Sequence, residues 1–300
     1  MSFFKKSLIS IFVILFLFSS LAFAYPITIT DSTGTAITFN EEPSRVVSCA
    51  PSNTEIIFAL GKGDKLVGVT NYADYPEEAK KIEKIGKMSP LNAEKIISLK
   101  PDVVFCFGGF QLKEAIKLRK LGLKVVIFEP KTVEETLTTI LDVGKILNAE
   151  AQAKEILKDF RGRLDLVSSN VKNISFEERP KVFIGSMYEP IYSPGKGTFL
   201  NELIEIAGGR NIVTTNGWAK ISPEFVVKAN PDIVVIPLGV MSMTNLEEAK
   251  EKLSKKEVYK NLRATKEGRI YFIDENIVFR PGPRLIDGIE KLYYFFYEKK

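Results

Sequence analysis

The chain has 300 residues, a formal net charge of +5 and no histidine; 45% of its residues are hydrophobic and 26% are charged. This balance is typical of a globular protein with an apolar core, and the weak net charge argues against a nucleic-acid partner. The lack of histidine removes the commonest general base and the commonest transition-metal ligand, which argues against an enzyme or a metal site.

The first 24 residues have the pattern of an export signal. Lys5 and Lys6 precede an apolar run over residues 8–18, and Ala22-Phe23-Ala24 ends the segment with small residues at the spacing of a cleavage site. We therefore expect a soluble periplasmic or secreted protein that begins near Tyr25. No cysteine lies near this site to carry a lipid, so a lipid anchor is not expected. The alternative to cleavage is an uncleaved signal that acts as a membrane anchor.

Residues 25–131 predict an α/β lobe. An edge-strand-like segment over 27–39 is followed by short β-branched runs that alternate with helical segments. Apolar strands of this kind, separated by helices, indicate a parallel sheet covered on both faces, which is a doubly wound lobe. The expected strands are 45–49, 65–70, 102–107 and 124–128, and the expected helices are 53–60, 92–99 and 112–121.

Residues 132–178 predict a helical linker, and residues 179–300 predict a second α/β lobe. Between Thr132 and Val171 glycine and proline are almost absent and apolar residues fall at helical spacing, which favours a short helix followed by a long one. The expected strands of the second lobe are 181–186, 232–236 and 269–273, and its expected helices are 198–207 and 285–297.

The two lobes contain a repeated segment. Residues 92–104 and 222–234 each begin with a helix-capping residue two positions before a glutamate, and each continues into Pro-Asp and a β-branched strand seven residues later. The alternative explanation for this similarity is that both segments merely carry the ordinary start and stop signals of a helix. Since open α/β sheets bind ligands outside the carboxyl ends of their strands, two facing lobes predict a ligand cleft between them. A rigid helical connector predicts that this cleft closes only slightly.

Several segments in this order resemble the helical-backbone class of periplasmic substrate-binding proteins. They are Ser48–Glu55, Val67–Pro76, the segments around Glu94 and Glu224, and Gly197–Asn211. That class serves ABC importers of cobalamin, haem and ferric siderophores, and residues 53–55, 71–76 and 81–83 look most like its cobalamin-binding members. The resemblance implies a binding protein without a cofactor of its own, whose partners are a small metal chelate and a permease dimer with its ATPase subunits.

The resemblance also implies a docking role for two acidic residues. In the class, one acidic residue on each lobe meets an arginine pocket on each half of the permease, and Glu94 and Glu224 occupy equivalent places in the repeat. The alternative is that both residues only complement the dipoles of their helices.

The expected ligand wall consists of residues that follow predicted strands. Aromatic and apolar side chains there can lie flat against a large planar ring while a few polar groups orient it. The alternative is that these side chains merely cover the edges of the lobes. The candidates are Tyr72, Met88, Phe107, Tyr192, Trp218 and Arg280.

The identity of the ligand stays open at this stage. Some cobalamin binders carry tryptophan where this chain has Met88 and Cys106 or Phe107, so a ferric siderophore remains an alternative. An anionic siderophore needs several cations in the cleft, whereas cobalamin needs few. Arg280 and Arg284 are therefore relevant to this choice, and Arg280 together with Lys87 is compatible with either ligand. Haem is less expected, because without histidine only Tyr, Met or Cys could serve as its axial ligand.

The two cysteines, Cys49 and Cys106, end strands that would be neighbours in a flavodoxin-like sheet. They predict either a disulfide or two buried thiols.

Two other functional classes are alternatives to a transport protein. Neither Gly61–Leu66 nor Pro194–Thr198 completes a phosphate-binding loop, and without histidine no Ser-His or Cys-His pair exists, so no enzymatic activity is expected. A membrane-anchored extracellular sensor domain is the remaining alternative, which would depend on an uncleaved signal.

Overall fold

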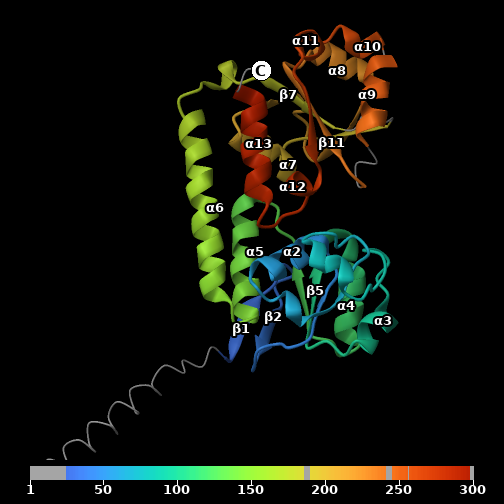
Figure 1. Ribbon diagram of the computed structural model, residues 1–300, viewed down its shortest axis with the longest axis vertical. Helices are drawn as coiled ribbons and strands as arrows, with labels where there is room; N and C mark the ends of the chain where they lie inside the picture. The colour runs from blue at the N-terminus through green and yellow to red at the C-terminus, as the bar shows by residue number, and fades with distance from the viewer. Residues whose placement is uncertain (1–24, 186–189, 241–244, 256, 298–300) are drawn as a thin grey trace, which may run out of the picture.

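The computed structural model describes residues 25–185, 190–240, 245–255 and 257–297, so the predicted export signal lies outside the described residues. Two α/β lobes are stacked along the long axis, and the long helix α6 (Glu150–Val171) runs beside both of them (Figure 1). This is the predicted architecture. Within the described ranges, no helix combines the length and the apolar character needed to cross a membrane.

The N-terminal lobe is built on a four-stranded parallel sheet with the order β4-β3-β5-β6. Its strands are almost completely buried, as expected for a sheet with helices on its faces. The first helix begins at Pro51, two residues before the predicted start, because proline is well suited to the first turn of a helix. The strands are β3 (Val46–Ser48), β4 (Leu66–Val69), β5 (Val103–Phe107) and β6 (Val125–Phe128), and the helices are α2 (Pro51–Ala59), α3 (Ala93–Ser98) and α4 (Leu112–Lys120).

The edge-strand prediction for residues 27–39 was wrong. This segment folds back on itself into an antiparallel hairpin of β1 (Ile27–Thr30) and β2 (Ala36–Phe39), whose strands pair only with each other among the described strands. A turn containing Gly34, with φ of 76°, reverses the chain. The hairpin is attached to β6 through its turn, since Ile127 N–H donates to Asp31 and Ser32 N–H donates to the Ile127 carbonyl.

Two helices connect the lobes, as predicted. Helix α5 (Val133–Ile146) packs against α2 of the N-terminal lobe and α7 (Phe199–Ile206) of the C-terminal lobe. Helix α6 follows it and packs on the closing helix α13 (Leu285–Tyr297), to which Arg163 binds through Asp287 and Glu290 at 2.5–2.9 Å. Because α5 touches elements of both lobes and α6 packs on the second, the connector is part of the core rather than a free linker.

The C-terminal lobe contains a second parallel sheet, with the order β12-β11-β7-β9, and a separate antiparallel ribbon of β8 and β10. The ribbon was not predicted, because its strands are short and half-exposed. The strands are β7 (Lys181–Ile184), β8 (Ile191–Pro194), β9 (Arg210–Asn211), β10 (Trp218–Ile221), β11 (Ile233–Leu238) and β12 (Ile270–Asp274). The remaining helices are α8 (Pro223–Ala229), α9 (Leu246–Lys255), α10 (Glu257–Lys260), α11 (Arg263–Lys266) and α12 (Asn276–Phe279).

The internal repeat corresponds to equivalent elements in the two lobes. Helix α3 leads into β5 and helix α8 leads into β11, and each strand pairs in parallel with the first strand of its own sheet. Residues Lys100 and Asn230, each directly before a Pro-Asp pair, both have φ near +47°, at 48° and 46°. The following aspartates, Asp102 and Asp232, both accept backbone hydrogen bonds of 2.8 Å from the start of the neighbouring strand.

Cys49 and Cys106 lie at neighbouring strands as predicted, and both are buried free thiols. A hydrogen bond that the Cys49 thiol donates to the Cys106 side chain, together with burial, raises the pKa of Cys49 well above its ordinary value. A thiol with a raised pKa stays protonated and unreactive at neutral pH. The buried-thiol alternative therefore describes this structure.

Candidate functional site

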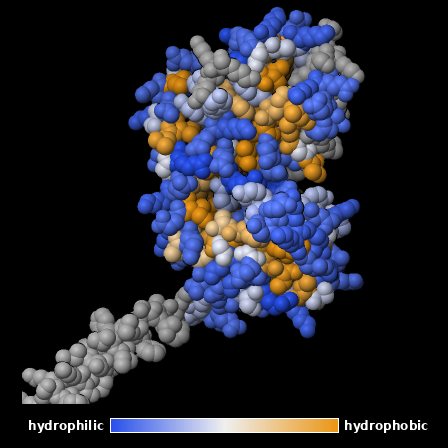
Figure 2. Space-filling view, viewed as in Figure 1, coloured by the Kyte–Doolittle hydropathy of each residue, from blue (hydrophilic) through white to orange (hydrophobic). Residues whose placement is uncertain are grey.

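A cavity of about 750 Å³ lies between the lobes. Its walls come from the loops that follow β3, β4 and β5 in one lobe and β11 and β12 in the other. These are the carboxyl ends of both parallel sheets, where an open α/β fold binds its ligands. The space-filling view shows a notch between the two lobes, with hydrophobic residues of the upper lobe reaching its edge (Figure 2).

The N-terminal lobe forms the lower wall of the cavity, and this wall contains three of the predicted ligand residues. Tyr72, Met88 and Phe107 all line it, and the Phe107 ring stacks on Phe110 with a centroid separation of 6.2 Å. Phe110 was not predicted, although it follows Gly108-Gly109 directly after the strand. The upper wall contains Phe279, which directly precedes the predicted ligand residue Arg280 and was expected there with it. It also contains two apolar side chains that were not predicted, Leu238 and Val240.

Tyr192 and Trp218, also predicted for the ligand wall, lie in the β8–β10 ribbon rather than in strand-end loops. They are 52% and 55% exposed and are not among the residues that line the cavity. Trp218 nevertheless lies close to it, because its ring meets that of Phe279 edge-on at 6.2 Å. The structure thus places Trp218 one side chain away from the cavity.

A buried glutamine holds the lower wall together. Gln111 is completely buried at the start of α4, where it accepts a 2.8 Å hydrogen bond from Phe107 N–H. Its amide nitrogen donates to the carbonyl oxygens of Cys49 and Met88, both at 2.8 Å. One side chain therefore joins the ends of two strands to the loop that carries Met88. A glutamine two residues after a strand-end glycine pair was the only sequence signal for this role.

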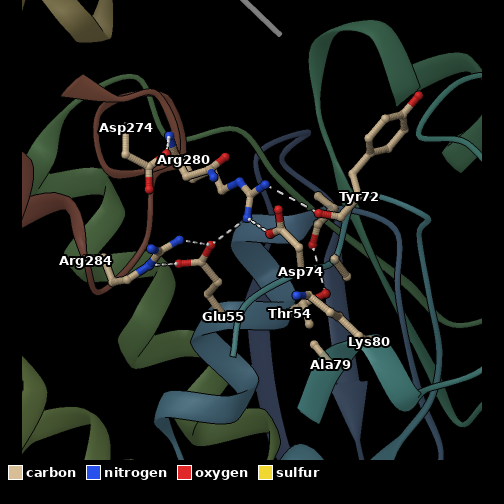
Figure 3. Close-up of polar contacts among 12 residues, drawn as sticks. Thr54, Glu55, Tyr72, Asp74, Ala79, Lys80, Asp274, Arg280 and Arg284 are labelled. Carbon is tan, nitrogen blue, oxygen red and sulfur yellow. Dashed lines mark hydrogen bonds and ion pairs between the residues drawn. The ribbon is translucent and has the colours of Figure 1, made fainter. Parts of the chain in front are cut away.

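Arg280, the remaining predicted ligand residue, lines the cavity but belongs to a network of ion pairs between the lobes (Figure 3). Its guanidinium group donates to Glu55 at 2.9 Å and to Asp74 at 2.7 Å. Arg284 binds both carboxylate oxygens of Glu55 at 2.7–2.8 Å, and its guanidinium carbon lies 3.8 Å from the centre of the Tyr75 ring.

The centre of this network is almost inaccessible to water. The Glu55 side chain is only 2% exposed, and Arg280 is 11% exposed. Burial by itself lowers the pKa of Arg284, but the ion pair with Glu55 outweighs this effect and raises it above its ordinary value. Two carboxylates and two guanidinium groups therefore hold the two lobes together beside the cavity.

Glu94 and Glu224 occupy equivalent positions, as the repeat predicts. Each is exposed and is the second residue of its helix, and the capping residues Asn92 and Ser222 each accept a backbone hydrogen bond from the residue three positions on. Both helices lie on the side of the molecule remote from α6 (Figure 1). Since each helix precedes a parallel strand and runs opposite to it, the two helix N-termini point toward the cleft side of their lobes.

The comparisons with known proteins agree with this geometry. The profile of a periplasmic binding protein family matches residues 46–277, which is most of the chain. The chain belongs to this family. A substrate-binding lipoprotein of an ABC transporter in Bacillus subtilis is 36% identical over 274 residues, covering 89% of this chain and 84% of that protein. The vitamin B12-binding protein of Photorhabdus laumondii is 30% identical over 254 residues, covering 83% and 86% of the two chains.

Among solved structures, the periplasmic haem-binding protein RhuT of Roseiflexus has a TM-score of 0.74 and 26% identity, covering 85% of this chain and 98% of that one. The family and the fold are therefore those expected from the resemblance. Its members are substrate-binding proteins of ABC importers and not enzymes. The described part of the chain holds no group of three Cys, Asp or Glu side chains arranged to bind a metal ion.

Proposed function

We propose that this periplasmic binding protein captures a corrinoid, most simply cobalamin, outside the cytoplasm and delivers it to the permease dimer of an ABC importer. The observation that carries this proposal is the interlobe cavity, whose volume falls within the usual range for small-molecule sites and whose walls are mainly apolar. Tyr72, Phe107 and Phe279 offer rings from both lobes to a flat macrocycle. The similarity to a vitamin B12-binding protein supports the same ligand.

Haem is the second candidate, supported by the structural similarity to RhuT. An exposed axial ligand from Tyr72 or Met88 would be needed, since the chain has no histidine. A ferric siderophore is the third candidate ligand.

The ligand can be identified through the only tryptophan of the chain. Because Trp218 contacts Phe279 at the cavity edge, we expect cyanocobalamin to quench its fluorescence in a saturable way. Quenching by haemin or a ferric siderophore instead would replace the ligand but keep the site. The control variant Trp218→Phe should lose the signal while calorimetry still detects binding. Calorimetric silence with every ligand would contradict the proposal.

We further propose that Glu94 and Glu224 dock the loaded protein on the two halves of the permease. Their exposure and their equivalent positions on the two lobes support a symmetric contact. The double variant Glu94→Ala/Glu224→Ala should keep its ligand affinity and lose transport in reconstituted vesicles. The matched control Glu155→Ala/Glu177→Ala removes two exposed glutamates elsewhere and should transport normally. Normal uptake by the first variant would overturn the assignment.

A further inference from the structure

One segment of the lower cavity wall is held by a single hydrogen bond. Met88 and Ser89 line the cavity and belong to the irregular segment 87–91. Within the described ranges, the only hydrogen bond that this segment makes is the one that the Met88 carbonyl accepts from the Gln111 side chain at 2.8 Å. At its far end, Leu91 packs into the apolar core. The place of Met88 on the wall therefore depends on Gln111.

Gln111 is itself fixed to the sheet. Its side-chain oxygen accepts from Phe107 N–H at the end of β5, and its amide nitrogen also donates to the Cys49 carbonyl directly after β3, both at 2.8 Å. A glutamine amide offers two N–H donors and one acceptor oxygen, so both donors and the oxygen are used here. The side chain is 0% exposed, so water does not compete for these bonds. Gln111 thus ties the Met88 segment to two strands of the sheet.

A wall that is already in place favours binding. A loop that has to become ordered when the ligand arrives lowers the affinity by the cost of ordering it. If the binding-competent arrangement is populated only part of the time, the dissociation constant rises by the inverse of that fraction. Met88 is exposed to this cost because its segment has one polar tether, whereas Phe107 is held by the pairing of β5 with β6.

We infer that Gln111 is a positioning residue for the ligand: it holds the Met88 segment against the sheet in the ligand-free protein, so that the lower wall is shaped before the ligand binds. Gln111 does not itself line the cavity, so it acts through Met88 and not by touching the ligand. The inference rests on the proposed function of the cavity as the ligand site and deepens it.

A double-mutant cycle tests the path from Gln111 to the ligand. Gln111→Met keeps an unbranched side chain and removes all three hydrogen bonds, and it should raise the calorimetric dissociation constant for cyanocobalamin about tenfold. Combined with Met88→Ala, which already lacks the wall side chain, it should add less than about threefold. The matched cycle with Val240→Ala, which trims the opposite wall, should be additive. If Gln111→Met does not fold, Gln111→Glu replaces it, because it keeps the oxygen that accepts from Phe107 N–H and lacks the amide donors.

Two measurements separate positioning from a purely structural role. Leu118→Ala removes a buried side chain from the same helix and should lower stability while leaving the affinity unchanged at a temperature where all variants are folded. A nitroxide attached to Lys87→Cys reports the mobility of the segment, because Cys49 and Cys106 are buried and do not compete for the label. In ligand-free protein its spectrum should sharpen with Gln111→Met and not with Leu118→Ala.

Failure of this inference and failure of the corrinoid assignment give different results. If cyanocobalamin binds but Gln111→Met leaves the nitroxide spectrum unchanged, or costs the same affinity with and without the Met88 side chain, the positioning role is wrong and the corrinoid assignment stands. If haemin or a ferric siderophore binds instead and the cycle run with that ligand shows the coupling, the corrinoid assignment is wrong and the positioning role stands. If none of these ligands binds the wild type, both are wrong.

Discussion

Single buried polar residues hold the functional parts of this protein in place. Asp31 joins the N-terminal hairpin to the first lobe: its side chain is inaccessible to water, forms an ion pair with Arg119 and accepts a hydrogen bond from Ile127 N–H. Burial raises the pKa of Asp31, but hydrogen bonds from Thr33, Ile127 and Arg119 outweigh burial and bring it below its ordinary value. The ionised form is therefore the one that stabilises the fold.

Asp31→Asn should lower the free energy of unfolding by about 2 kcal/mol at neutral pH, because it removes the charged partner of Arg119. A group with a lowered pKa in the folded protein stabilises it above its unfolded pKa, which is about 3.9, and this contribution is lost as the pH falls through the folded pKa. Denaturant titrations should therefore show the gap between the two proteins shrinking below about pH 4. A gap that does not vary with pH would show that the charge of Asp31 does not matter.

At the scale of elements, the repeated helix-to-strand unit explains much of the molecule. In both lobes a capped helix of one to two turns ends in a left-handed residue before Pro-Asp, and the aspartate binds the start of the next strand. The unit was visible in the sequence because caps, prolines and β-branched strands are local signals. The β8–β10 ribbon was not visible, since pairing of two short strands depends on residues far apart in the sequence, such as Ile191 and Ile221.

The caps of the two repeats should make equal and independent contributions. Asn92→Ala and Ser222→Ala each remove one side-chain hydrogen bond at a helix N-terminus, at 3.0 and 3.3 Å. Each substitution should cost about 1 kcal/mol in the free energy of unfolding, and the double variant should cost the sum because the sites lie in different lobes. Equilibrium unfolding in urea would check this. A strongly non-additive double variant would show that the lobes are coupled through these helices.

At the scale of the whole molecule, the buried ion pairs beside the cavity link lobes that are otherwise joined through α5 and α6. Glu55 comes from α2 in the first lobe, whereas Arg280 and Arg284 lie just before the closing helix α13, more than 200 positions later. Removing one member of a buried cluster leaves its partners with unmatched charge, which is more costly than removing the whole cluster.

Glu55→Gln should therefore lower the free energy of unfolding by about 3 kcal/mol and increase the separation of the lobes, which small-angle X-ray scattering would detect. Glu55→Gln combined with Arg284→Met restores the balance of charge and should recover part of the lost stability. If the single variant is as stable as the wild type, the ion pairs do not hold the lobes together.

The sequence by itself determined the two α/β lobes, their helical connector, the internal repeat and four of the residues that line the cavity: Tyr72, Met88, Phe107 and Arg280. These features follow from hydrophobic periodicity, helix caps and the rule that parallel strands end at one edge of their sheet, all of which act over short stretches of chain.

Only the tertiary structure decided which charges meet. Arg280 was a plausible ligand cation in the sequence, but in the fold it lies against Glu55 and Asp74 from the other lobe. Likewise, Glu275 lies beside the cavity because Gly239, directly after the neighbouring strand, leaves room for it. The charge of a cleft depends on side chains that are distant in sequence, and their pairing is set by how the two lobes pack.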